Sequence, residues 1–217
     1  MADSDQVKET ASVEKENKQP MTFRQKIDYF KDYYLLKVVL VLLALVFVGL
    51  FIRDAYKNSK TIYTGGTVGF DLYDDKFAFL SDGFINYLGD DYKGKKAQFG
   101  GNALMIPEGQ EYERNNVETA FVAQVNAGMY NYLFMAKKEF DYFVDVDIYQ
   151  DISYIKEDPR FSDLDYVTGF EGKTVGIRLS EEAVSKLGVS DMDIYLVFAI
   201  KKNQNDLNLK FVEYLYS

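Results

Sequence analysis

The feature that most constrains this chain is an apolar run at residues 35–52, LLKVVLVLLALVFVGLFI, whose only charge is Lys37. At about 1.5 Å per helical residue, the run is close to the ~30 Å thickness of a bilayer's hydrocarbon core. A segment in lipid must satisfy its own backbone groups and is therefore helical, and Lys37 can extend its ammonium to the headgroups. A buried core helix is the alternative, but it would normally show a polar stripe. The run therefore predicts one transmembrane helix.

The residues before the run divide into a polar tail and a second helix. Residues 1–21 are mostly polar, contain no aromatic side chain and predict a disordered tail. Residues 22–34 predict an amphipathic helix beside the membrane, with Thr22 and Gln25 as a capping box. A plain extension of the membrane helix is the alternative. The apolar face of this predicted helix comprises Phe23, Ile27, Phe30 and Tyr34.

The flanks of the run also bear on how it is oriented. Phe51, Ile52 and Arg53 offer no small-residue cleavage signal, so we expect an uncleaved signal anchor. Within about twenty residues of each end, five Lys/Arg lie on the N-terminal side and three on the C-terminal side. We therefore predict a single-pass protein of the cell membrane, with a cytoplasmic N-terminus and an extracellular C-terminal domain.

The charge is distributed unevenly along the chain. Residues 1–60 carry ten Lys/Arg and eight Asp/Glu, whereas residues 61–217 carry fifteen and twenty-six. An acidic domain repels phosphate backbones, so nucleic acid is not an expected partner. It also repels anionic headgroups, and we expect the domain to stand off the membrane.

Three residue types are missing, since the sequence has no Cys, no His and no Trp. This excludes disulfides and thiol chemistry, and it removes the commonest neutral-pH acid/base and zinc ligand. Catalysis would have to use carboxylates, Lys, Tyr or Ser/Thr. We predict no catalytic residues and no cofactor, and we favour a non-enzymatic role.

The residues after the run predict one domain with alternating strands and helices. Residues 53–66 are polar, end in a Gly pair and predict a linker, and residues 67–217 predict the domain. The apolar runs at 130–136 and 193–201 indicate strands covered on both faces. The alternation predicts an α/β fold, a mixed sheet with helices on its faces.

Local signals give the remaining elements of the predicted domain. Asn116 as a cap and Gly128 as a terminator indicate a helix at 116–127, and Ser180 with Gly188 indicates another at 181–187. The other predicted strands are 67–72, 96–106 and 166–179, the last interrupted at 171–173, and the other predicted helices are 77–88, 137–144, 150–155 (a turn or helix) and 206–216.

The segment 23–34 followed at once by a membrane helix resembles uncharacterised single-pass membrane proteins of clostridia-type Gram-positive bacteria. Their outer domain resembles a reduced lobe of the type II extracytoplasmic solute-binding proteins. Three stretches carry the likeness: AQVNAG at 123–128 running into 130–136, YQDIS at 149–153 and LKFVEYL at 209–215. The resemblance implies a single periplasmic-binding-protein-like lobe. A full solute-binding protein has two lobes, and Asn131 stands where that family usually has Asp, so no ligand-binding residue is transferred.

Two groups of side chains are candidates for a site. Asp145, Asp147 and Asp151, with Asp141, could offer oxygens to Ca²⁺, but they lack the Gly and final Glu of an EF-hand loop. A solvated acidic face is the alternative, and no metal is predicted. The 18 Tyr and 17 Phe fit either a core without Trp or a surface that binds glycans, peptides or proteins. The tyrosines nearest the cleft edge that the resemblance implies are Tyr130, Tyr132, Tyr142 and Tyr149.

These observations leave three hypotheses for the function. The first is a non-enzymatic, membrane-anchored domain outside the cell that binds a small molecule, a peptide or a partner protein. The second is a carboxylate-dependent hydrolase acting on cell-wall glycan, which needs two carboxylates about 5–10 Å apart in a groove. The third is a structural subunit of a membrane complex, docked through the membrane helix and its aromatic neighbour.

Overall fold

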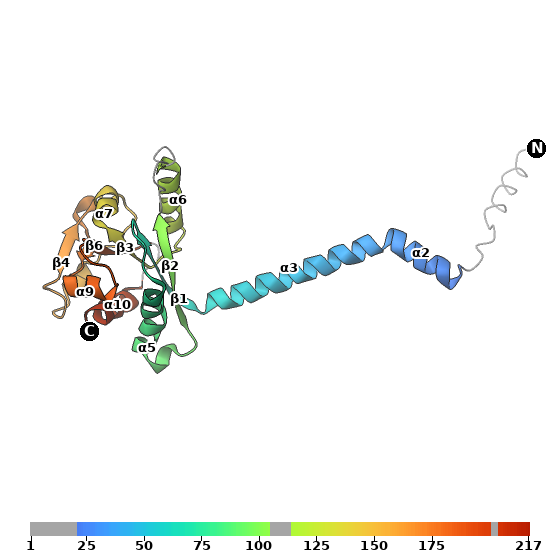
Figure 1. Cartoon of the computed structure of the whole chain (residues 1–217), viewed down its shortest axis with the longest axis horizontal. Helices are drawn as coiled ribbons and strands as arrows, with labels where there is room; N and C mark the ends of the chain where they lie inside the picture. Colours follow the sequence, from blue (N-terminus) through green and yellow to red (C-terminus); the bar gives the residue numbers. More distant parts are fainter. Residues whose placement is uncertain (1–20, 105–113, 201–203) are drawn as a thin grey trace, which may run out of the picture. The chain divides into compact units, whose positions relative to one another are not determined.

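The computed structural model describes residues 21–104, 114–200 and 204–217, and the chain divides into two units, 1–56 and 57–217 (Figure 1). The predicted tail at 1–21 lies outside the described residues except for its last one.

The predicted helix beside the membrane segment is α2, Phe23–Tyr33. Its capping box is confirmed, because Gln25 N donates to Thr22 Oγ1 (3.4 Å) while Thr22 N donates to Gln25 Oε1 (2.9 Å). Phe30 and Tyr34 stack with ring centroids 6.0 Å apart, as the i, i+4 spacing on one helix face allows. The helix ends at Tyr33, and Tyr34 is its C-cap, whose N–H donates to Phe30 O.

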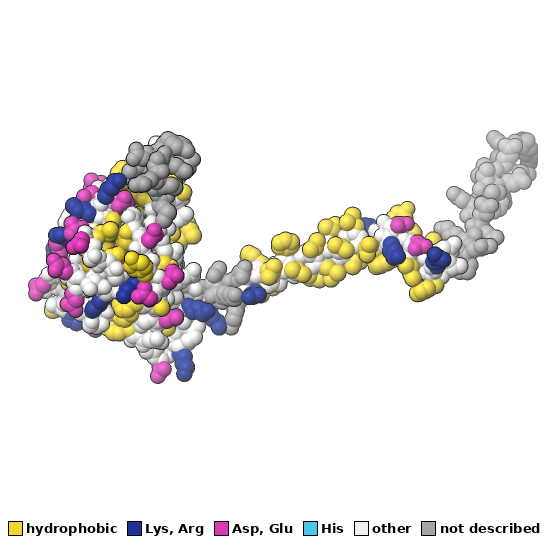
Figure 2. Space-filling model, viewed as in Figure 1, with side chains coloured by type: hydrophobic (Ala, Val, Ile, Leu, Met, Phe, Trp, Pro, Cys, Tyr) yellow, Lys and Arg dark blue, Asp and Glu magenta, His cyan; other side chains and the backbone are white. Residues whose placement is uncertain are grey.

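The apolar run lies in α3, Leu35–Ser59. Its first 19 residues, Leu35–Arg53, are long and apolar enough to cross a membrane, and none of them is buried. Figure 2 shows hydrophobic side chains along this stretch. The linker prediction for 53–66 is wrong, because α3 continues to Ser59 and β1 begins at Thr61. No Gly or Pro interrupts residues 53–59, so polar composition alone does not end the helix.

The second unit is built on a six-stranded mixed sheet with the strand order β2-β1-β3-β6-β5-β4. β1 is parallel to both β2 and β3, whereas β6 is antiparallel to β3 and β5, and β4 is antiparallel to β5. This confirms the predicted mixed α/β class. The strands are β1 Thr61–Val68, β2 Lys96–Leu104, β3 Tyr132–Ala136, β4 Asp165–Thr168, β5 Thr174–Arg178 and β6 Ile194–Phe198.

Helices cover both faces of the sheet (Figure 1). One face packs against the segment from α4 to α5 and against α8, α9 and α10, and the other packs against α6 and α7. α6 begins two residues before Asn116, the predicted cap. The helices are α4 Asp74–Ala78, the π-helix η1 Phe79–Gly83, α5 Phe84–Leu88, α6 Arg114–Asn126, α7 Lys137–Phe143, α8 Ser153–Lys156, α9 Glu181–Lys186 and α10 Asn205–Tyr216, with 3₁₀ turns η2 Asp90–Tyr92 and η4 Phe170–Gly172.

The centre of the core is formed by β3 and β6, whose residues are all buried. Along β3, Tyr132 and Phe134 point to the α10 face, while Leu133 and Met135 point to the α6–α7 face. Continuous apolar sequence is what a strand covered on both faces requires. The two predicted strands are therefore confirmed, over the shorter ranges 132–136 and 194–198, and residue 201 of the second prediction lies outside the described residues.

Tyr132 explains why the Gly pair lies within a strand. Its ring lies directly over Gly65 of β1, and a Cβ added there would overlap the ring. The same ring is 5.1 Å from the Tyr63 ring and 4.1 Å from the Phe211 ring, centroid to centroid. Gly65 is thus required by packing, since no larger residue leaves room for this aromatic cluster.

A buried polar network fixes α10 to the same face. Tyr63 OH donates to Asn208 Oδ1 (2.8 Å), and Asn208 Nδ2 donates to Gln150 Oε1 and to Tyr154 OH, both at 3.1 Å. Asn208 is completely buried, so each of these bonds satisfies a group that would otherwise be costly to leave unpaired. The network sets the position of α10 in a way that apolar contacts alone do not.

Substitution of Gly65 tests this packing. Gly65→Ala is expected to lower the free energy of unfolding by about 1–3 kcal/mol, because the added methyl group displaces the Tyr132 ring. For a domain of this size that corresponds to a melting temperature lower by roughly 2–12 °C, measured by circular dichroism on the detergent-solubilised chain. Gly100→Ala on the neighbouring strand is the control, since the nearest heavy atom to its Cβ is 3.7 Å away. Equal melting temperatures for the two variants would contradict this account.

Candidate functional site

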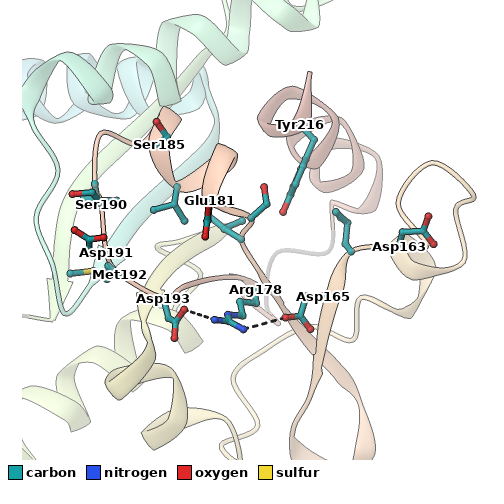
Figure 3. Close-up of a pocket in the computed structure, with 15 residues that line it drawn as sticks. Asp163, Asp165, Arg178, Glu181, Ser185, Ser190, Asp191, Met192, Asp193 and Tyr216 are labelled. Atoms are coloured by element: carbon teal, nitrogen blue, oxygen red, sulfur yellow. Dashed lines mark hydrogen bonds and ion pairs between the residues drawn. The ribbon is translucent and has the colours of Figure 1, made fainter.

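The second unit contains a half-open depression of about 810 Å³ (Figure 3). Its walls come from the start of β4, the end of β5, α9 and the loop before β6, with Tyr216 of α10 at one side. The sheet register places Arg178 beside Tyr195, which in turn pairs with Met135. The depression therefore lies at the same edge of the sheet as the carboxyl end of β3.

The charged groups of the depression are mostly acidic. Five carboxylates and one guanidinium line it, and Figure 3 shows Arg178 between two of the acids. Arg178 Nη2 is 2.6 Å from Asp193 Oδ1, and Nη1 is 3.8 Å from Asp165 Oδ2. The hydrogen bond with Asp193 raises the pKa of Arg178 above its ordinary value, so the guanidinium stays charged. The acidic side chains are Asp163, Asp165, Glu181, Asp191 and Asp193.

These carboxylates remain accessible to a ligand. The Arg178 and Asp193 side chains are 46% and 42% exposed, and Asp165 is 65% exposed, so the ion pairs add little to stability. Asp163, Glu181 and Asp191 form no ion pair with a described Lys or Arg. The rim therefore carries more negative charge than its single guanidinium neutralises.

Local sequence explains how the walls are held. Ser180 caps α9 as predicted, its Oγ accepting from Ala183 N at 3.3 Å. Gly188 ends the helix with φ 74°, which glycine adopts freely. Asp191 also has a positive φ, 56°, in the loop that turns back into β6. The lining also has an apolar part, whose aliphatic members are Leu164, Leu179, Val184 and Val189.

The structure does not bring the four candidate tyrosines together. Tyr132 and Tyr149 are each only 1% exposed and belong to opposite faces of the sheet. Tyr149 OH donates to Met135 Sδ (3.1 Å) inside the core. These two residues serve the core because helices cover both faces of the sheet, so they are not ligand contacts in this conformation.

The other two candidate tyrosines lie nearer the surface. Tyr130 OH donates to Gln124 Oε1 at 3.2 Å, and Tyr142, which is 52% exposed, donates to Glu118 Oε2 at 2.8 Å. Glu118 is the one buried carboxylate among the described residues, and this bond joins α6 to α7. A ligand role for Tyr130 and Tyr142 stays a prediction.

The acidic side chains considered for Ca²⁺ have other partners or lie apart. Asp147 pairs with Lys173 at 3.0 Å, and Asp141 pairs with Lys137 at 2.8 Å. Asp151 Oδ1 accepts from Ser153 N (3.0 Å) and from Ser153 Oγ (2.6 Å), which forms an Asx turn before α8. Asp145 is exposed. Within the part of the chain that the structure describes, no three acidic side chains form a group that could hold a metal ion.

No protein-family model, curated protein or solved structure matches this chain. What the domain does must therefore be inferred from its own surface, above all from the depression. Sequence reasoning missed this site because its five acids are spread over residues 163–193 in three separate segments. The available signal was that Asp165 begins β4 and Asp193 directly precedes β6, the two strands that flank β5 and run antiparallel to it.

The Asx turn makes a pH-dependent prediction. The hydrogen bonds from Ser153 lower the pKa of Asp151, so its stabilising effect is present above the unfolded pKa of about 4 and is lost as the pH falls through the lower folded value. Asp151→Ala is expected to reduce the free energy of unfolding by about 0.5–1.5 kcal/mol at pH 7. The difference from the unmodified chain should shrink at pH 3, measured by urea unfolding. Asp145→Ala, the exposed control, should have little effect at either pH, and a constant difference for Asp151→Ala would refute the role of its carboxylate.

Proposed function

We propose that this chain is a single-pass membrane protein whose α/β domain lies outside the cell and binds a basic segment of a partner. The exposed apolar helix Leu35–Arg53 supports the anchor, and the excess of Lys/Arg before it supports a cytoplasmic N-terminus. The absence of His and Cys favours binding over catalysis.

The observation that carries this proposal is that acidic and aliphatic side chains line the same depression. Five exposed carboxylates around one arginine attract Lys or Arg side chains. The apolar lining from Leu164, Leu179 and Val184 offers a surface for the methylene stems of those side chains or for neighbouring apolar residues. A short peptide segment with positive charges fits both parts better than an anionic or purely apolar ligand.

The likeness to a solute-binding lobe supports the same chemistry with a smaller ligand. A sheet covered by helices on both faces is compatible with one such lobe. In that case the depression would hold a small cationic solute, which is positively charged as the proposed peptide is. The glycan hydrolase hypothesis is less favoured, since every Asp and Glu that lines the depression is exposed and none is enclosed in a buried groove.

Binding of fluorescein-labelled hexalysine to the full chain in non-ionic detergent tests the proposal. Asp163→Asn/Asp191→Asn removes two rim charges, and Asn tolerates the positive φ at position 191. Affinity is expected to fall roughly 2- to 30-fold, because each exposed charge contributes about 0.2–1 kcal/mol. Fluorescence anisotropy measures the change.

The matched control removes the same number of charges elsewhere, in Asp82→Asn/Asp145→Asn, two exposed acids outside the depression. It should bind hexalysine nearly as well as the unmodified chain. If both double variants weaken binding equally, the peptide responds to net charge and the depression is not its site.

The orientation requires a separate measurement. Because the chain has no Cys, Ser162→Cys in the domain and Ser12→Cys before the membrane helix each provide a unique thiol. A membrane-impermeant maleimide is expected to label Ser162→Cys on intact cells and Ser12→Cys only after lysis. The reverse pattern would place the domain in the cytoplasm and overturn this part of the proposal.

A further inference from the structure

A group of lysines occupies the end of the domain from which α3 enters. Lys60 follows the last residue of α3, and its carbonyl accepts from Lys96 N at 2.9 Å. Lys93 and Lys95 lie in the turn before β2, and Lys210 of α10 lies 5.2 Å from the ring centroid of Tyr92. We call these five residues the lysine cluster: Lys60, Lys93, Lys95, Lys96 and Lys210.

The lysine cluster is positively charged, whereas the rest of the domain carries a net negative charge. Lys93, Lys95 and Lys96 are exposed, and none of them forms an ion pair with a described carboxylate. Asp90 and Asp91 of η2 are the acids closest in sequence, so positive charge remains in excess here. Residues 61–217 as a whole carry eleven more acidic than basic side chains. Figure 2 shows acidic side chains spread over the face of the domain in view.

Chain length keeps this cluster close to the apolar segment. The apolar stretch ends at Arg53, and α3 continues as a helix to Ser59, immediately before Lys60. Seven residues at 1.5 Å each span roughly 10 Å, which is little more than the headgroup layer of one leaflet. If the apolar stretch spans a bilayer, the beginnings of β1 and β2 are therefore held near its surface.

We infer that the lysine cluster binds anionic phospholipid headgroups beside the membrane helix. Lysines near a membrane surface are attracted to anionic lipids, and the acidic remainder of the domain is repelled by the same charge. The two effects together turn the beginnings of β1 and β2 toward the bilayer. This revises the expectation, based on net charge alone, that the domain stands off the membrane. The inference that the lysine cluster binds lipid does not depend on which ligand the depression binds, or on which side of the membrane the domain lies.

The test uses the full chain in vesicles of phosphatidylcholine with or without phosphatidylglycerol. Gln98→Cys, an exposed position two residues beyond Lys96, carries an environment-sensitive fluorophore as the only thiol adduct. Quenching by headgroup spin-labelled lipid is expected to rise severalfold when phosphatidylglycerol is present and to fall as salt is added. Lys93→Glu/Lys95→Glu should abolish the rise.

Lys138→Glu/Lys156→Glu is the matched control, because it makes the same change in charge at two exposed lysines on α7 and α8. It should keep the lipid-dependent quenching. Equal quenching in the two kinds of vesicle, or equal loss in both double variants, would overturn the inference. If Lys93→Glu/Lys95→Glu fails to fold, the labelled chain with all its lysines still tests the inference. Its quenching in phosphatidylglycerol vesicles should fall as salt is added, and quenching that does not change with salt would overturn the inference.

Discussion

The domain depends on burying both faces of β3 and β6 at once. One face of β3 requires the Tyr132 ring to fit between Gly65 and Phe211, and the other requires α6 and α7 to cover Leu133 and Met135. The fully buried Asn208 then needs polar partners, which it finds in Tyr63, Gln150 and Tyr154. The position of α10 follows from these contacts, because neither the aromatic cluster nor the polar network is complete without it.

Much of this architecture was predictable from local pattern. Residues 132–136 and 194–200 are apolar at successive positions, which is the pattern of strands covered on both faces, and the caps at Thr22 and Ser180 are where the sequence predicts them. β1 was not predictable in the same way. Its TIYTGGTV sequence has the composition of a linker, and the need for Gly65 arises only from a ring that lies 67 residues further along the chain.

The candidate site was less predictable than the fold. Burial decides whether a tyrosine can meet a ligand, and Tyr132 and Tyr149 are buried by elements distant in sequence. The depression draws its acids from three segments that only the folded sheet and α9 bring together. The net charge of the domain did not predict the lysine cluster either, because it sums over positive and negative side chains that lie in different places. The lysine cluster and the acidic rim can therefore serve different partners on one domain.

The strand order has a consequence for how the chain folds during synthesis. β6 lies between β3 and β5, although the ribosome makes it after both of them. Until residues 194–198 emerge, β3 and β5 each present an open apolar edge, and the two parts of the sheet have nothing to join them. Closure is therefore late and depends on contacts between distant segments, which slows folding. During that interval the nascent chain is most exposed to pairing with the wrong strand.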